Sequence, residues 1–453
     1  MRQIKFRQVT CQTRFQIDEN TDKTLTSYAY LLSNVTRKLF ADSFKKSFSD
    51  LKSDYLKRFQ ITARQFNSCK IELEGKIAAY KETLSLLISK VTRKIKSTQN
   101  TMASLEKKKK KEELHQVKRR FFILNQKKQR LEEDQKKGKI RLCFGSKKLF
   151  KAQFNLEENG YANHNKWKQD WVNKRNRNFF IVGSKDESSG NQTCQIKLQE
   201  NGKFSLFLRL PNGFDQKILV LTDIDIPYRK IDLLNCIKNN EKRKELQKLK
   251  NPSFKNFGQA INYRFLKDEK GWRVFISFKV FEPIWESFEK FGCIGVDINI
   301  NHLAVVETDR FGNPISKKNI PCCVYGKTKK QALAIIGDAS KKIVELATST
   351  KKPIVLENLD FDKKKDTLNK TLGKKYSRML SSFSYKKIIE TIIGKAWDEK
   401  IKVFQVNPAY TSVIGRVKFA KRYGLTVHDF AALVIARRYM RFLKKTTSPS
   451  SCS

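Results

Sequence analysis

The first residues of the chain alternate between apolar and polar positions. Between residues 2 and 17, basic or polar residues are interleaved with apolar ones, from Ile4 and Phe6 to Phe15 and Ile17. A period of two residues is typical of a strand with one buried face. The pattern predicts a β element at the start of the chain, and its strands need pairing partners from further along the sequence.

A helical period comes next. From Thr24 the apolar residues recur at steps of three and four, most plainly at Ile71, Leu73, Ile77, Tyr80, Leu84, Leu87, Val91 and Ile95. A second stripe follows at Leu114, Val117, Phe121, Leu124 and Leu131, and Gly138 provides a stop signal. These two amphipathic helices indicate a helical lobe over residues 23–137.

The second stripe is surrounded by basic side chains. Among these we take as candidate nucleic-acid contacts Lys107, Lys108, Lys109, Arg119 and Arg120. A helical hairpin with a merely solvated charged face is the alternative interpretation. Because the whole chain is basic, we favour contact with phosphates.

Strand signals return after residue 138. Strand-like segments occur at 194–198, 203–210, 260–266 and 272–281, and Asn201-Gly202 between the first two is a strong hairpin signal. The segment 138–288 is therefore predicted to be mostly β. We expect the strands of residues 1–22 to join its sheet, so that the helical lobe is an insertion.

From residue 289 to 445, strands and helices alternate. Apolar strands are predicted in CIGVDINI, LAVVETD, PIVLENL and KVFQVN, and helices at 332–346, 385–397 and 427–443. This alternation is typical of an α/β layer with a mixed or parallel sheet. The polar tail, 446–453, is expected to be disordered.

The charge balance narrows the class of partner. The chain of 453 residues carries 94 Lys and Arg against 45 Asp and Glu, a formal net charge of +49. Such an excess is tolerated mainly beside a polyanion, so nucleic acid is the expected partner. The hydrophobic content of 39% is ample for packed cores and argues against a disordered polycation.

The cysteine, histidine and hydropathy patterns argue against a disulfide-bonded, zinc-binding or membrane-spanning protein. The nine cysteines show neither a disulfide framework nor C-x2-C spacing, and the four histidines make a His-based metal site improbable. No run of 18 apolar residues occurs. We expect a protein of the cytoplasm, associated with the nucleoid, that neither spans a membrane nor is secreted.

Three acidic residues stand where burial is expected. Asp297 interrupts an apolar strand, Glu357 ends another, and Asp429 opens an apolar helix. A buried carboxylate costs several kcal/mol unless a cation compensates it, and three together would repel each other. Magnesium, or manganese in its place, would resolve that conflict. A cap or a salt bridge is the commoner role of any single acid, and the spacing alone does not distinguish these three.

A family resemblance does distinguish them. The strings CIGVDININHLAVVETD, KKPIVLENLDF, YSRMLSSFSYKKII, VFQVNPAYTS and HDFAALVIARR resemble, in that order, the split RuvC nuclease domain of the transposon-encoded TnpB proteins. TnpB proteins are RNA-guided DNA endonucleases related to the compact type V CRISPR effectors. The resemblance implies that Asp297, Glu357 and Asp429 are the three RuvC acids and hold two magnesium ions.

The same resemblance implies a fold. It implies a multidomain α+β protein whose C-terminal domain, 289–445, is RNase H-like (RuvC). A β-barrel-like wedge domain, 1–22 and 138–288, would precede it, interrupted by an α-helical recognition lobe at 23–137.

One segment departs from the family pattern. TnpB-like proteins commonly carry a C-x2-C zinc-binding pair before the third acid, whereas residues 413–428 contain no cysteine. We therefore expect no zinc, and a zinc-free loop whose basic residues contact phosphates: Arg416, Lys418, Lys421 and Arg422.

The predicted function is RNA-guided, magnesium-dependent cleavage of DNA. A guide RNA would select the target DNA by pairing, and the protein would hold the heteroduplex by its backbone. Two alternatives stay open: a nuclease-silent RNA-guided DNA-binding repressor, and a guide-free RuvC-type nuclease. His302 and His428 lie near two of the acids in sequence and could orient water, although a structural role is the commoner one. Candidate stacking aromatics, for which core packing is the favoured alternative, are Phe121, Phe122, Trp167, Trp171, Phe179 and Phe180.

Overall fold

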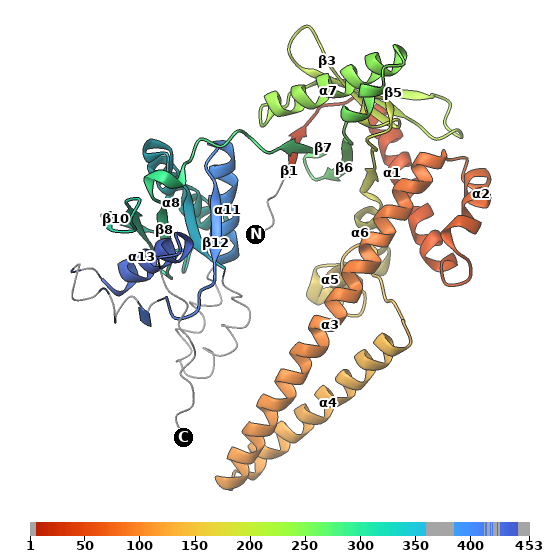
Figure 1. Cartoon of the computed structure of the whole chain (residues 1–453). Coiled ribbons are helices and arrows are strands. Elements are labelled where there is room, and N and C mark those ends of the chain that lie inside the picture. Colours follow the sequence, from red (N-terminus) through yellow and green to blue (C-terminus); the bar gives the residue numbers. More distant parts are fainter. Residues whose placement is uncertain are drawn as a thin grey trace. The chain divides into compact units, whose positions relative to one another are not determined.

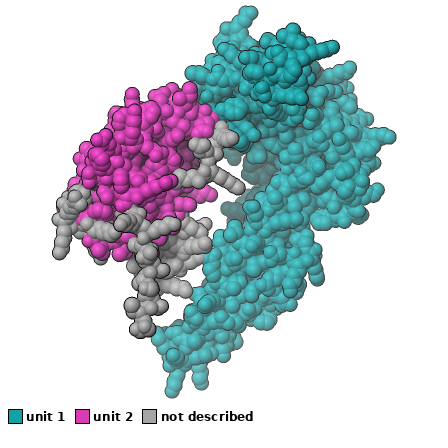
Figure 2. All heavy atoms as spheres, in the orientation of Figure 1, with its two compact units in different colours: residues 1–281 teal, residues 282–453 magenta. Residues whose placement is uncertain are grey.

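The computed structural model divides the chain into two compact units, residues 1–281 and 282–453 (Figure 2). It describes residues 6–358, 385–411, 413, 414, 417, 419, 424 and 426–442. The predicted tail at 446–453 lies outside the described residues. Each unit is described by itself.

Helices dominate the first half of unit 1. They are α1 (Glu19–Asp42), α2 (Phe48–Arg58), α3 (Ala63–Lys107), α4 (Lys111–Lys136), α5 (Lys147–Ala152) and α6 (His164–Asn176). Asp18 caps α1 by accepting the Thr21 amide hydrogen, and Thr62 with Gln65 forms a capping box at the start of α3. Both amphipathic helices expected from the sequence are confirmed.

Helices α3 and α4 form a long hairpin. The 45 residues of α3 span about 68 Å at 1.5 Å per residue, and α4 packs alongside its second half (Figure 1). The apolar stripe of α3 is buried at Leu84, Val91 and Ile95, whereas in α4 only Asp134 is buried, paired with Arg141. The hairpin therefore exposes most of its basic surface.

The strands of unit 1 form two open sheets. One has the order β1-β7-β6-β2, and the other the order β3-β4-β5. Their bounds, with those of the helix α7, are β1 (Phe6–Arg14), β2 (Asn178–Ile181), β3 (Cys194–Leu198), β4 (Phe204–Arg209), β5 (Ile218–Ile224), α7 (Lys230–Lys248), β6 (Asn262–Asp268) and β7 (Gly271–Phe281). All pairs are antiparallel, and β1 pairs with β7 from Phe6 opposite Phe281 to Arg14 opposite Arg273. The predicted joining of the first strand to the later sheet is confirmed.

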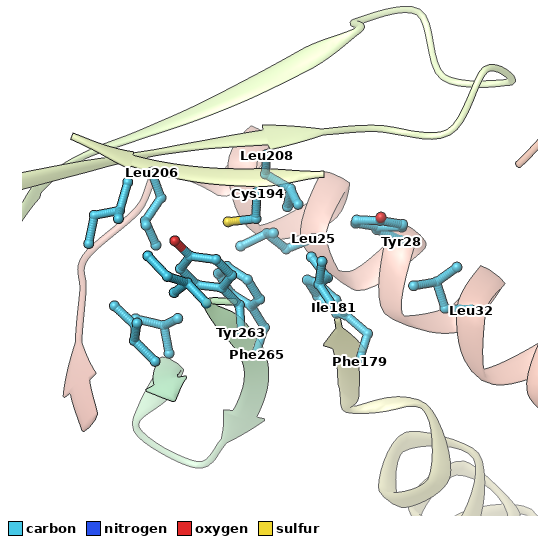
Figure 3. Close-up of a cluster of buried hydrophobic side chains, with 14 of the residues drawn as sticks. Leu25, Tyr28, Leu32, Phe179, Ile181, Cys194, Leu206, Leu208, Tyr263 and Phe265 are labelled. Atoms are coloured by element: carbon cyan, nitrogen blue, oxygen red, sulfur yellow. The ribbon is translucent and has the colours of Figure 1, made fainter. Parts of the chain in front are cut away.

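The expected barrel is wrong. Among the described residues no strand of one sheet pairs with a strand of the other, so the ladder does not close. The two sheets instead turn apolar faces toward a shared core. Figure 3 shows Leu206 and Leu208 of β4 opposite Tyr263 and Phe265 of β6, with side chains of α1 completing the layer. Burial of that apolar surface holds the sheets together without hydrogen-bonded closure.

Unit 2 contains one five-stranded mixed sheet, ordered β10-β9-β8-β11-β12. The strand β9 is antiparallel to both β8 and β10, whereas β11 is parallel to both β8 and β12. The bounds are β8 (Ile294–Ile298), β9 (His302–Thr308), β10 (Pro314–Pro321), α8 (Lys329–Thr350), β11 (Ile354–Glu357), α11 (Tyr385–Asp398), β12 (Val403–Val406) and α13 (Val427–Tyr439).

Helices cover both faces of this sheet. Side chains of α8 and α11 pack on one face, with Ile294, Val296 and Leu356 in their shared core. Side chains of α13 pack on the other, against Cys293, Val306 and Val355. The predicted α/β layer is confirmed, and the molecule is a mixed α+β protein. No described helix has the length and apolarity needed to cross a membrane.

Candidate carboxylate site in unit 2

The alternation of β8 decides where Asp297 points. Ile294 and Val296 belong to the core under α8 and α11, whereas Cys293 packs with α13. Since successive side chains of a strand point to opposite faces, Asp297 lies on the α13 face. The contact between His428 Nδ1 of α13 and Asp297 Oδ2, at 3.2 Å, agrees.

Glu357 reaches the same face from the neighbouring strand. In β11, Leu356 packs with α8 and α11, and Val355 packs with α13, so Glu357 follows Val355 to the α13 side. Leu356 pairs with Val296 in parallel register. Continued by one residue, this register sets Glu357 beside Asp297, with their strands about 4.8 Å apart.

Gly295 brings the third acid to this face. A Cβ built at Gly295 would overlap the carbonyl oxygen of Ala432, so only glycine lets the backbone of α13 lie directly on β8. Asp429 is one turn before Ala432 in α13, and Asp297 follows Gly295 by two residues on the same face. The three acids of the sequence analysis therefore share one face of the sheet.

Each carboxylate has its own hydrogen-bond partners. Asp297 Oδ2 accepts from Asn299 Nδ2 at 3.0 Å, besides its contact with His428. Glu357, which is buried, accepts at Oε1 a hydrogen bond of 2.6 Å from the hydroxyl of Thr411. These partners hold the two side chains in defined positions.

Asp429 is the most unusual of the three. Its side chain is fully buried, and Oδ2 accepts hydrogen bonds from the Thr426 amide and hydroxyl at 3.1 and 2.8 Å. Its other oxygen, Oδ1, has no hydrogen-bond partner among the described residues. Among the described residues, the cation that contacts this carboxylate is Lys317, whose Nζ lies 3.8 Å from Oδ2. A buried carboxylate oxygen without a partner is costly, so this position favours a bound cation.

Two histidine rings lie beside the acids. The ring centroids of His302 and His428 are 5.1 Å apart, and the rings meet edge to face. Burial, and secondarily the charge of His428, lower the pKa of His302, while Asp297 and Asp429 oppose that shift. His302 is therefore favoured in its neutral form.

The described side chains do not assemble a metal cluster as they stand. Among the described residues no group of three or more His, Cys, Asp and Glu could hold a metal ion. The contacts above give one physical reason: His428, Thr411 and Thr426 each engage one of the carboxylates. Magnesium binding stays a prediction, and so does the expectation of no zinc.

The predicted basic residues divide into two sets. Those of the helical hairpin are all exposed: Lys107 ends α3, the next two lie in the turn, and Arg119 and Arg120 are on α4. The zinc-free loop set, Arg416, Lys418, Lys421 and Arg422, lies outside the described residues. Among the candidate aromatics, Trp167 and Phe179 are buried, Phe122 is exposed, and Phe121, Trp171 and Phe180 are half-buried.

Several residues of the site were missed by sequence reasoning. Asn299 has a weak signal, because it follows Asp297 by two residues. Thr411 stands in one of the matched strings without any mark of its contact with Glu357. Lys317 gives no signal, since its place depends on the pairing of β10 with β9, where it lies opposite Val306.

Comparison with known proteins finds distant similarity to solved structures. No protein-family model matches the chain, and no curated protein matches it. Among solved structures, the chain is similar to one in a cryo-EM structure of a Cas12f1–sgRNA–target DNA complex, with 12% identity and a TM-score of 0.25 over 58% of this chain and 67% of that one.

Two further structures are similar at the same identity of 12%. One is a CRISPR-Cas12f ternary complex, with a TM-score of 0.27 over 92% of this chain and 80% of that chain. The other is the Cas12i1 R-loop complex before target DNA cleavage, with a TM-score of 0.15 over 82% and 42%. Because all three TM-scores are well below 0.5, we base the function on the residues of this chain.

Proposed function

We propose that the protein is an RNA-guided DNA endonuclease whose carboxylates Asp297, Glu357 and Asp429 hold magnesium. The observation that carries the proposal is that these side chains share one face of the unit 2 sheet, where β8 and β11 end and α13 begins. Carboxylates are the ligand type that hard divalent cations prefer, and these three lie on the same face of the sheet.

Magnesium would be held mainly by these three carboxylates. The orphaned Asp429 Oδ1 fits this use, because a cation would satisfy a buried oxygen that has no described hydrogen-bond donor. Bound metal would supply Lewis acidity for hydrolysis of a phosphodiester bond. Asn299 and Thr411 would orient the carboxylates of Asp297 and Glu357.

The nucleic-acid partners follow from charge and from the resemblance. The net charge of +49 and the exposed basic residues of the α3–α4 hairpin suit a protein that covers phosphate backbones. A guide RNA would supply sequence selection by pairing with target DNA, which the protein would hold without reading its bases.

A second candidate is a nuclease-silent, RNA-guided DNA-binding protein. The observation that favours it is that no described group of acids is gathered for a metal, while Lys317 and His428 contact the carboxylates of Asp429 and Asp297. In that case the ammonium of Lys317 would permanently take the place of a metal beside Asp429.

Plasmid cleavage distinguishes these candidates. The protein is purified with its co-purifying RNA, the RNA is sequenced, and a plasmid carrying the matched sequence is incubated with magnesium or with EDTA. The proposal expects magnesium-dependent cutting that Asp297→Ala abolishes and that Asp338→Ala, at an exposed position of α8, leaves intact. Binding without cutting would support the silent candidate, and cutting without RNA would support a guide-free nuclease.

A further inference from the structure

The four-stranded sheet of unit 1 has one face turned away from the core. Its inner face carries Val9, Tyr263, Phe265 and Ile276, all buried in the core shared with α1 and the β3–β5 sheet. Figure 3 shows Tyr263 and Phe265 of this face. The alternate residues of the same strands lie on the opposite face and are exposed or half-buried.

Aromatic and cationic side chains alternate on this outer face. The strand register sets Gln12, Phe275, Arg264 and Phe180 in one row across all four strands. The Arg264 guanidinium lies 5.6 Å from the centroid of the Phe180 ring. Arg273 lies on β7 two residues before Phe275, and its guanidinium is 5.4 Å from the centroid of the Phe275 ring. The two rings thus stand two strands apart, about 10 Å.

A polar and basic row continues beside it. Gln8 pairs with Lys279, and Thr10 pairs with Ser277, on the same face. Farther along, the Lys279 ammonium lies 4.1 Å from the centroid of the exposed Phe6 ring. This surface, defined by Phe180, Arg264, Phe275, Gln12, Gln8 and Lys279, is called the outer sheet face below.

The charges on the outer sheet face are mostly positive. The one carboxylate among the outward-facing residues of the four strands, Asp268 at the end of β6, is bound by both Arg14 and Arg273, at 2.8 and 3.0 Å. Arg264 and Lys279 make no ion pair with any acidic side chain in the described part of the chain. Arg264 and Lys279 thus lie beside aromatic rings without an acidic partner. A ligand that combines phosphates with flat bases is complementary to such a surface.

We infer that the outer sheet face binds a short single-stranded RNA segment, with bases stacked on Phe275 and Phe180 and phosphates against Arg264 and Lys279. Stacking on aromatic rings over a basic sheet is a sequence-tolerant way to hold single strands. The amides of Gln8 and Gln12 and the hydroxyls of Thr10 and Ser277 can bond a 2′-hydroxyl, which favours RNA over DNA. This surface is separate from the carboxylate site, and RNA binding there does not require cleavage.

The test measures both affinity and location. The full-length protein, freed of nucleic acid, is titrated into a labelled, unstructured 12-nucleotide RNA in EDTA at several salt concentrations. A second sample is crosslinked to the same RNA containing 4-thiouridine, and the crosslinked peptides are sequenced. We expect crosslinks in the peptides of β6 and β7.

Matched variants separate stacking from charge. Phe275→Ala should weaken RNA binding at least about fivefold without changing the salt dependence, because the ring carries no charge. Arg264→Gln should lower the slope of log affinity against log salt by about 0.7. The control is Phe207→Ala on β4, since Phe207 also has a lysine over its ring, Lys197 at 4.9 Å, but lies on the other sheet.

Three results would overturn the inference. One is unchanged affinity in both Phe275→Ala and Arg264→Gln. Another is crosslinking only to peptides outside the four strands, for example those of the α3–α4 hairpin. The last is equal affinity for DNA of the same sequence, which would refute the choice of RNA. Circular dichroism establishes that each variant folds, and Arg264, being exposed, tests the surface even if Phe275→Ala is unstable.

Discussion

Replacement of Gly295 by alanine tests how the candidate site is assembled. A Cβ at this position would overlap the Ala432 carbonyl oxygen and lie close to the Ala436 side chain. Both atoms belong to α13, so β8 and α13 must separate. Overpacking of this kind costs about 1–3 kcal/mol. Separation would also carry His428 and Asp429 away from Asp297.

Hydrogen–deuterium exchange of peptides from β8 and α13 measures the effect locally. A cost of about 1–3 kcal/mol corresponds to exchange that is roughly 5- to 150-fold faster through local opening. We expect cleavage to fall in parallel, because Asp429 is carried farther from Asp297.

Gly337→Ala is the matched control. Gly337 lies inside α8, and a Cβ built there meets no atom within 4 Å. The same substitution should therefore stabilise that helix, by about 0.5–1 kcal/mol. If Gly295→Ala exchanged like the wild type, α13 would not rest on β8 as described, and the assembly of the site would need another explanation.

Three further predictions concern cations beside carboxylates in unit 2. Lys317→Met removes the ammonium near Asp429, so magnesium should raise the melting temperature more in this variant than in the control Lys318→Met, at the exposed neighbouring position. Equal magnesium responses in the two variants would contradict the competition between Lys317 and magnesium for Asp429. Lys352 and Glu307 form a buried pair at 2.7 Å, and Lys352→Met should cost about 3–5 kcal/mol in denaturant unfolding of unit 2. Although burial opposes it, hydrogen bonds from Lys352 and Ser316 lower the pKa of Glu307 below 4.5. The stabilisation that the ionised Glu307 carboxylate gives to unit 2 is therefore present above pH 4.5 and is lost as the pH falls through the lowered pKa. Glu307→Gln should remove this pH dependence of the unfolding free energy.

Local patterns predicted the elements well, because each element buries one face. The period of two in residues 2–17 and the stripe from Ile71 to Ile95 both correspond to observed structure, β1 and α3. That the first strand joins the later sheet followed from the need of a lone strand for a partner, whereas the choice of β7 as that partner was not predicted. Barrel closure could not be predicted in this way, because it depends on hydrogen bonds between strands far apart in sequence.

The candidate site was predictable only in part. Asp297, Glu357 and Asp429 break apolar runs, so burial drew attention to them. Gly295 gave no comparable signal, since a glycine in a strand has several explanations. The contact of Lys317 with Asp429 depends on the strand neighbours of β10, which are set by tertiary structure.

The pairing of β1 with β7 has a consequence during synthesis. Arg14 leaves the ribosome roughly 260 residues before its partner, Arg273. At about 5–20 residues per second, the first strand waits some 13–50 s for its neighbour. Throughout that interval Val9 and Cys11, later interior side chains, are on a strand without its ladder. The nascent chain thus exposes an unpaired strand edge that is prone to aggregation. A chaperone that shields this segment would raise the yield of native protein.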